Sequence, residues 1–298
     1  MSTGEVEIYQ PSSHKGQIWR DRMKRWLRLL PAYGILGLWS LFTVFVLLWI
    51  GLASLKTNRE LFLNVWALPT KLQFQNYVKA WSQLHLGSYF LNSFEVVMAS
   101  VIIILVLSAP ASYILSRAKF RGSNLLILIF VAGIGIPLPL LFIPLFVILA
   151  QIKLINTLPG LGIVYVASSI PFTVYMLTGF FASLPQELEE AAILDGCSDI
   201  EVFTKVMLPL ASPGLITAAI FNFVFLWTEY QLALVFISAP EFRTLSLGLY
   251  ALENSMEYTG DWVGLMAGVV CVVVPTIILY IFLSERMISG ITMGAVKS

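Results

Sequence analysis

Six long apolar runs alternate with polar segments along the chain and give the first indication of its fold. The runs occupy residues 31–52, 96–115, 125–150, 161–184, about 214–238 and 262–284. Each is long enough to cross a hydrocarbon core of about 30 Å as an α-helix that rises about 1.5 Å per residue. Because a helix satisfies its own backbone hydrogen bonds in lipid, the pattern predicts an all-α, polytopic membrane helical bundle with six transmembrane helices.

Composition supports this class of protein. Of the 298 residues, 58% are hydrophobic and only 12% are charged, whereas about 25% of residues are charged in a soluble domain. We expect a polar N-terminal tail over residues 1–30, a transmembrane domain over 31–284 and a short tail over 285–298. The basic tail lacks a small-residue cleavage site, so the first run is expected to remain as a membrane anchor. Two cysteines form no metal-binding pattern.

Lysine and arginine set the expected orientation. With the N-terminus placed in the cytoplasm, 12 of the 18 basic residues lie on the cytoplasmic side, in agreement with the positive-inside rule. Both termini are then cytoplasmic, and so is the polar stretch between the fourth and fifth runs. Prolines interrupt three of the runs, where a missing backbone donor favours kinks: Pro110, Pro137, Pro139, Pro144 and Pro171.

The stretch from 183 to 212 carries six of the 17 acidic residues in the chain. Ser183 with Gln186, and Ser198 with Glu201, have the spacing of capping boxes. Gly196 suits a left-handed helix end, and Pro209 is expected to stop the second helix. The stretch is therefore predicted to be two short helices that meet at a glycine. The residue pattern alone leaves open a docking element or a solvated hairpin that only links two spans.

The same stretch resembles the EAA motif of permease subunits of binding-protein-dependent ABC importers. The matching residues and their spacing are Glu190, Ala191 and Ala192, then Gly196, then Val206-Met207-Leu208-Pro209. The sequence departs from the motif only at Val206, where the family often has Ile. This long fixed spacing in a loop between late spans makes the resemblance specific.

The resemblance covers nearly the whole chain and is strongest to the maltose-type (MalG-like) carbohydrate permease family. "SLKTNRELF" and "NYVKAW" resemble its external segment, and "FLNSFEVV" and "SRAKFRG" bracket the second span as similar segments do there. The ending "ISGITMGAVKS" is similar to the family's terminal "G-L-T-x-G-A-V-K-G". In this tail Ile291, Met293 and Ser298 depart from the family, and Gly290 and Gly294 are candidates for tail contacts.

Membership would imply that the 183–212 stretch is a coupling helix seated on a cytoplasmic ATPase subunit, with Glu190 near a basic residue of that subunit. The implied assembly contains a second homologous permease, two ATPase subunits that use ATP and Mg²⁺, and an external solute-binding protein. The implied location is a prokaryotic cytoplasmic (inner) membrane. The sequence holds no G-x-x-x-x-G-K-[ST] phosphate loop, so this chain is expected to be a transport subunit without an ATPase site.

The resemblance also implies that external segments of about 53–89 and 239–261 face the binding protein. Their aromatic residues are candidate contacts or, equally, anchors at the membrane interface: Trp66, Trp81, Tyr250 and Tyr258. The solute would be a sugar, such as a disaccharide or oligosaccharide. A polyol phosphate, a polyamine or another solute of this importer class remains an alternative.

Glu229 is the one acid well inside an apolar run. A charge at the centre of a bilayer costs about 3 kcal/mol on insertion scales, so it should face protein or water. Tyr230 follows the family pattern beside it, and Asn222 lies seven residues earlier. These three residues are candidates for the substrate path, although a structural role for Glu229 between helices fits equally well.

An intramembrane enzyme and a secondary transporter are the two alternative classes of protein. An intramembrane enzyme is disfavoured because the chain has only two histidines, no G-x-S-x-G elbow and no paired acids inside the spans. No catalytic residue is therefore assigned. A secondary transporter fits the interrupted helices and the buried acid better. The coupling motif and the lack of a detectable inverted repeat favour the ABC permease instead.

Overall fold

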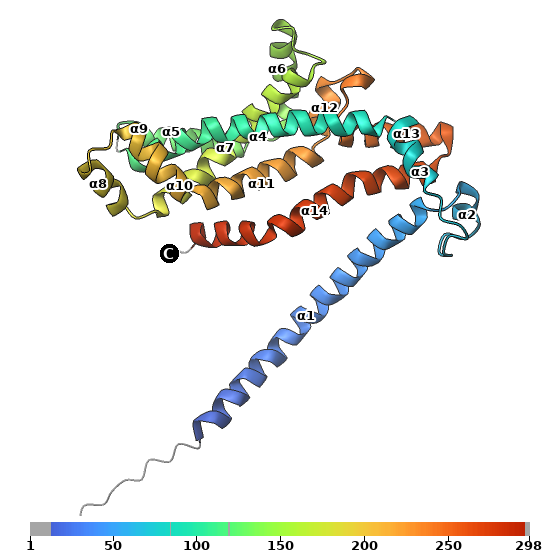
Figure 1. Cartoon of the computed structure of the whole chain (residues 1–298), viewed down its shortest axis with the longest axis horizontal. Helices are drawn as coiled ribbons and strands as arrows, with labels where there is room; N and C mark the ends of the chain where they lie inside the picture. Colours follow the sequence, from blue (N-terminus) through green and yellow to red (C-terminus); the bar gives the residue numbers. More distant parts are fainter. Residues whose placement is uncertain (1–12, 84, 119, 296–298) are drawn as a thin grey trace, which may run out of the picture.

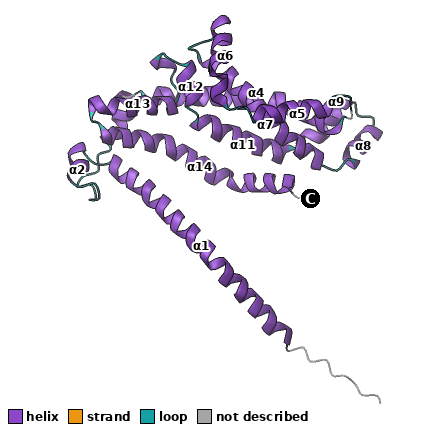
Figure 2. Cartoon of the chain, turned by 180° about the vertical axis from the view of Figure 1, so that it is seen from behind, coloured by secondary structure: helices purple, strands orange, loops and turns teal. Residues whose placement is uncertain are grey.

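The computed structural model describes the backbone of residues 13–83, 85–118 and 120–295. It describes the side chains of residues 29–82, 85–118, 120–255, 260–278, 280 and 281. All regular structure in these ranges is helical (Figures 1 and 2), which confirms the all-α prediction. The longer helices are α1 (Ser13–Ser54), α4 (Leu86–Arg117), α5 (Ser123–Ile134), α6 (Leu138–Gln151), α7 (Leu158–Ser183), α11 (Ser212–Thr228), α13 (Leu245–Thr259) and α14 (Trp262–Ala295).

Short helices connect the long ones. They are α2 (Asn58–Leu63), α3 (Gln75–Val78), η1 (Lys79–Gln83), α8 (Glu187–Leu194), α9 (Asp199–Glu201), η2 (Val202–Met207), α10 (Leu208–Leu210), α12 (Gln231–Phe236) and η3 (Pro240–Phe242). Helices α8 to α10 gather at one end of the bundle, which we call the α8 end. Helices α2, α3 and α13 lie at the opposite α2 end, and α1 begins and α14 finishes toward the α8 end (Figures 1 and 2).

The predicted count of six spans is not confirmed as such. Among the described residues, three helical segments are long and apolar enough to cross a membrane, at Leu29–Ser54, Leu86–Arg117 and Leu158–Ser183, and two bent helix pairs raise the number to as many as five. The sixth predicted run lies in α14. Within the residues whose side chains are described, its apolar part extends from Trp262 to Ile278 and is shorter than the other spans.

The third predicted span is not one helix. Helices α5 and α6 replace it and are bent by 101° relative to each other. The break lies at Gly135, Ile136 and Pro137, and Pro137 caps α6 with extended backbone (ψ 123°). Proline lacks a backbone donor and disfavours helical geometry in the residue before it. Prolines 110, 171 and 275, in contrast, lie inside continuous helices.

Helices α4 and α7 form the centre of the bundle, side by side in both views (Figures 1 and 2). Val97 and Ile104 of α4 are buried with Leu161 and Tyr165 of α7 in one apolar cluster. Helix α1 differs, because it diverges from the bundle (Figure 1) and the most apolar window of its segment Leu29–Ser54 is not buried at all. Among the described side chains of α1, only Ala53 and Ser54 in its last turn are buried, and Ala53 lies in one cluster with Leu61 and Val263.

Candidate functional site: the loop between α7 and α11

Helix α8 begins at Glu187, later than the sequence pattern predicted. The expected capping box of Ser183 and Gln186 is wrong, because the Ser183 hydroxyl donates to the Phe180 carbonyl (2.7 Å) and belongs to the end of α7. Pro185 explains the difference: it favours extended backbone at Leu184 (ψ 146°), which separates the two helices. Three acids still occupy the first turn of α8, where the helix dipole favours negative charge.

Helix α8 ends as predicted at a left-handed glycine. Asp195 is its C-cap, and Gly196 follows with φ +87°. A residue with a Cβ rarely adopts this conformation. Gly196 therefore allows the chain to turn sharply from α8 into the next helix.

The second helix of the loop has the predicted start but not the predicted stop. The Ser198 backbone N–H and hydroxyl both donate to the Glu201 carboxylate, at 3.0 and 2.9 Å. The helix then continues through Pro209 to Leu210 and bends by 70° before α11. A π-helical turn precedes Pro209, in which the Leu208 N–H bonds the Phe203 carbonyl five residues back. This wider turn accommodates a ring that would clash in a regular α-helix.

The loop has a buried and an exposed face. Ala192, Val202 and Met207 are buried with Phe180 and Phe181 of α7 in one cluster. Away from this cluster, large apolar side chains are exposed: Leu194 by 87%, Ile200 by 75% and Ile193 by 53%. Large apolar side chains exposed close together along one loop favour a binding surface over a hairpin that is only solvated.

The six motif residues do not all share the exposed face. Glu190, Ala191, Gly196 and Pro209 are exposed, Leu208 is half-buried, and Ala192 is buried. Ala192 therefore packs against this chain and does not contribute to the exposed surface of the loop. Glu190 accepts a hydrogen bond from Gln186 Nε2 (3.1 Å) on the surface of the same helix.

A residue outside the predicted set links the loop to the bundle. The Glu189 carboxylate accepts a hydrogen bond from the Tyr113 hydroxyl (2.6 Å) and lies 3.5 Å from Nε of Arg117 in an ion pair. Arg117 Nη2 also donates to the Leu184 carbonyl (2.7 Å). Sequence spacing held no signal for this contact, because its partners are more than 70 residues apart. In the sequence, Arg117 is only one of the 12 basic residues that predict the orientation of the chain in the membrane.

Glu229 lies at the break between α11 and α12. Its carboxylate accepts hydrogen bonds from the backbone N–H groups of Leu232 (2.5 Å) and Ala233 (3.3 Å), so it caps α12. The hydroxyl of the buried Tyr165 donates to the same carboxylate (3.0 Å). The geometry favours the structural role that the sequence left open, since the charge is held within protein.

Asn222 and Tyr230 have other surroundings. The buried Asn222 donates to the Thr173 hydroxyl (2.9 Å) and to the Ala218 carbonyl (2.8 Å). It lines a small pocket of about 300 Å³ with Phe172, Phe221 and Phe225. The half-exposed Tyr230 stacks on Tyr250 with ring centroids 5.4 Å apart. The three path candidates therefore do not converge on one group of contacts.

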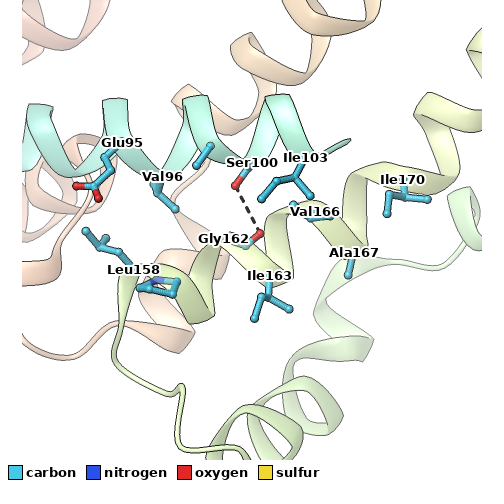
Figure 3. Close-up of a pocket in the computed structure, with 12 residues that line it drawn as sticks. Glu95, Val96, Ser100, Ile103, Leu158, Gly162, Ile163, Val166, Ala167 and Ile170 are labelled. Atoms are coloured by element: carbon cyan, nitrogen blue, oxygen red, sulfur yellow. Dashed lines mark hydrogen bonds between the residues drawn. The ribbon is translucent and has the colours of Figure 1, made fainter. Parts of the chain in front are cut away.

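A larger groove of about 520 Å³ lies between α4 and α7 (Figure 3). Its lining is almost wholly apolar, and Glu95 stands at the rim toward the α2 end. Ser100 donates a long hydrogen bond to the Gly162 carbonyl (3.5 Å) across it. None of the predicted path residues lines this groove.

The α2 end is held by a cluster around Asp261. Its carboxylate accepts hydrogen bonds from Lys79 Nζ (2.6 Å) and Asn58 Nδ2 (3.1 Å), and Asn58 accepts one from the Val263 N–H (3.1 Å). Burial opposes ionisation of Asp261, but the bonds from Lys79 and Asn58 outweigh it and hold its pKa below the usual range. The cluster joins α2, η1 and the start of α14.

The remaining predicted contacts are described only in part. Trp66 and Trp81 at the α2 end are exposed, and Tyr250 is half-buried. The side chain of Tyr258 and the positions of Gly290 and Gly294, beyond residue 281, lie outside the residues whose side chains are described. Among the described residues, no group of three or more His, Cys, Asp and Glu side chains is arranged to hold a metal ion.

The architecture is that of a membrane protein: a bundle of apolar helices with an acidic pair of short helices at one end. The family described as "Binding-protein-dependent transport system inner membrane component" matches residues 108–289, and the chain belongs to this family. The predicted family is thereby confirmed, and with it an inner-membrane location and dependence on a binding protein.

Relatives and a solved structure agree with this assignment. The chain is 36% identical over 266 residues to the diacetylchitobiose uptake system permease protein NgcG of Streptomyces coelicolor. The aligned region covers 89% of this chain and 88% of that protein. It is 32% identical to the probable starch degradation products transport system permease protein AmyC of Thermoanaerobacterium thermosulfurigenes, over 85% and 94% of the two chains. A bacterial ABC transporter that imports alginate contains a chain of the same fold (TM-score 0.73, 21% identity, 94% and 99% covered).

Proposed function

We propose that this chain is the permease subunit of an ABC importer for a sugar, most specifically a disaccharide or oligosaccharide. The observation that carries the proposal is the folded loop between α7 and α11. Its helix pair packs on the bundle through Ala192, Val202 and Met207 and exposes Glu190 beside Leu194 and the turn at Gly196. Relatives named for diacetylchitobiose and starch products support a sugar as the solute.

The proposed machine has four kinds of subunit. This chain pairs with a second homologous permease, two ATPase subunits seat the α8 loops and use ATP with Mg²⁺, and an external binding protein delivers the sugar. ATP binding acts on the permease only through a difference in affinity for its two states, because a ligand shifts a conformational equilibrium by no more than that difference. A rigid docking element is needed to pass this preference to the spans.

The α8 end is proposed to be cytoplasmic, with both chain termini on that side. The start of α1 and the end of α14 lie toward the α8 end (Figures 1 and 2), and this orientation is the one for which the sequence assigns 12 of the 18 basic residues to the cytoplasmic side. The α2 end would then face the binding protein through Trp66, Trp81 and neighbouring exposed residues.

The substrate path is proposed to run past the α11–α12 break. Tyr230 is half-exposed there, and Asn222 lines a pocket about two helical turns earlier, along α11. Glu229 would keep this break open by capping α12. The carboxylate of Glu229 is bound by the Tyr165 hydroxyl and by backbone N–H groups. We therefore assign Glu229 a role in shaping the path and not in binding the solute.

Purification of the intact complex tests the proposal. The chain would be purified from its native membrane through a tag, in mild detergent, and every co-purifying protein identified by mass spectrometry. We expect an ATPase subunit with a phosphate-binding loop, a second multi-span permease and a solute-binding protein. If the chain purifies alone or only with copies of itself while known complexes of the same membrane stay intact, the proposal is wrong and a secondary transporter becomes the better explanation.

A further inference from the structure

Two adjacent acids of α8 have different surroundings. Glu190 lies on the exposed face and bonds only to Gln186 of its own turn among the described contacts. The side chain of Glu189 is only 18% exposed and points to α4, where it meets Tyr113 and Arg117. One acid is thus available to a partner, and its neighbour is engaged with the bundle.

Arg117 connects three elements at one point. It is the last residue of α4, its side chain is 13% exposed, and it pairs with Glu189 of α8. Its Nη2 also holds the carbonyl of Leu184, the C-cap of α7. Arg117 Nε makes no hydrogen bond of its own, so the ion pair is positioned by the bonds that Arg117 Nη2 makes to Leu184 and that Glu189 accepts from Tyr113.

Tyr113 fixes the second oxygen of the same carboxylate. Its hydroxyl donates to Glu189 Oε1 at 2.6 Å. Its ring packs against Phe203 of η2 and Phe181 of α7, with centroids 5.1 and 5.7 Å apart. The hydroxyl is therefore positioned by an aromatic cluster that also belongs to the loop.

We propose that Glu189, held by Arg117 and Tyr113, is the contact that makes α4 follow the movement of α8. This inference rests on the proposed function, in which an ATPase subunit moves the α8 loop. Helix α4 is continuous from Arg117 back to Leu86. A displacement at Arg117 therefore reaches Glu95, 22 residues or about 33 Å away along the helix, at the rim of the α4–α7 groove. Glu190 serves attachment and Glu189 serves transmission.

The test measures whether nucleotide at the ATPase changes the exposure of the far end of α4. The assembled importer would carry Glu95→Cys in a background with Cys197→Ser and Cys271→Ser. Labelling by a water-soluble maleimide would be timed with and without Mg²⁺ and a non-hydrolysable ATP analogue. We expect the analogue to change the labelling rate by about fivefold or more, the lower range of measured couplings between sites. Adding Glu189→Ala should abolish this response while the ATPase subunit still co-purifies.

Two further variants separate transmission from folding. Tyr113→Phe keeps the aromatic packing and removes only the hydroxyl, so it should reduce the response in a normally assembled complex. Arg117→Ala combined with Glu189→Ala should have no larger effect than either change alone, because the two groups act as one unit. The control is Lys205→Gln, which breaks an exposed ion pair of the same loop with Glu201 (66% and 42% exposed) and should leave the response unchanged.

The outcomes are decisive in each case. A full nucleotide response in assembled Glu189→Ala and Tyr113→Phe complexes overturns the transmission role, as does the absence of any response in the starting background with the ATPase attached. If Glu189→Ala fails to assemble, Tyr113→Phe decides alone. A wild-type chain that binds no ATPase would instead overturn the proposed function and this inference together.

Discussion

The two ends of the bundle use similar chemistry for different tasks. At the α2 end, Asp261 is bound by Lys79 and Asn58, and backbone N–H groups of α14 complete the cluster. At the α8 end, Glu189 is bound by side chains of a single helix, α4, next to exposed leucine and isoleucine. The first arrangement closes three segments into one unit. The second connects the proposed ATPase-binding surface to the bundle, so an ion pair alone does not reveal its role.

Gly196→Val should have the largest effect, and only at the α8 end. A β-branched residue at φ +87° is strained by about 1–3 kcal/mol, which predicts a roughly tenfold to hundredfold loss of coupled uptake. Uptake and the amount of co-purified ATPase per permease measure it. Gly34→Val in α1 is the matched control, because nothing lies within 4 Å of the position of its Cβ. Normal uptake by Gly196→Val would remove the α8 turn from the coupling mechanism.

Glu190→Ala sharpens the distinction between the two acids of α8. We expect about tenfold weaker ATPase attachment, equivalent to about 1.4 kcal/mol, because the exposed carboxylate loses its partner on the other subunit. Glu189→Ala should leave attachment unchanged. Titration of purified ATPase subunit onto the permease pair in detergent measures both. Equal loss of attachment in the two variants would contradict the division between attachment and transmission.

Asp261→Ala should affect the opposite end and a different property. Removing the acceptor of Lys79 and Asn58 is expected to destabilise the complex by about 1.5 kcal/mol, the low end of the range for hydrogen bonds to charged groups, because the side chain of Lys79 is 42% exposed. The midpoint of thermal unfolding should fall by a few degrees while ATPase attachment is retained. Lost attachment at full thermal stability would show that the α2 end contributes to coupling.

The pH dependence of the α2 end should be the smallest effect. The pKa of Asp261 is lowered in the folded chain, so its contribution is complete above the ordinary value of about 4 and is lost as the pH falls through the lowered value. The difference in unfolding midpoint between wild type and Asp261→Asn should therefore be constant from about pH 5 to 8 and shrink below about pH 4. A difference that changes near pH 7 would assign the effect to another group.

The sequence was most informative where local patterns decide structure. Apolar runs placed the long helices, Ser198 and Glu201 predicted their capping box, and Gly196 predicted the left-handed turn. A kink at Pro137 was predicted, but not a bend of 101° that divides the run into α5 and α6, because a missing backbone donor does not fix the size of a turn. The continuation through Pro209 was missed because proline in a helix normally ends it, and a π-helical turn overrides that rule here.

Contacts between distant residues could not be predicted from one sequence. The pairing of Arg117 with Glu189, and of Tyr165 with Glu229, depends on how helices pack and not on spacing along either helix. The cap that Glu229 provides to α12 was different, because its partners are only three and four residues away. Its sequence signal was present but was hidden by the apolar run around it.

The bend at Gly135 to Pro137 has a consequence for the surrounding lipid. Helix α5 has 12 residues and spans about 18 Å, little more than half of a hydrocarbon core of about 30 Å. At the bend the N–H groups of Gly135 and Ile136 still donate to the carbonyls of Ala132 and Gly133, at 3.1 and 3.4 Å, and Pro137 has no N–H to leave unpaired. An N–H group without a partner costs several kcal/mol among acyl chains, so these bonds let the chain turn inside a hydrophobic layer that α5 is too short to cross alone.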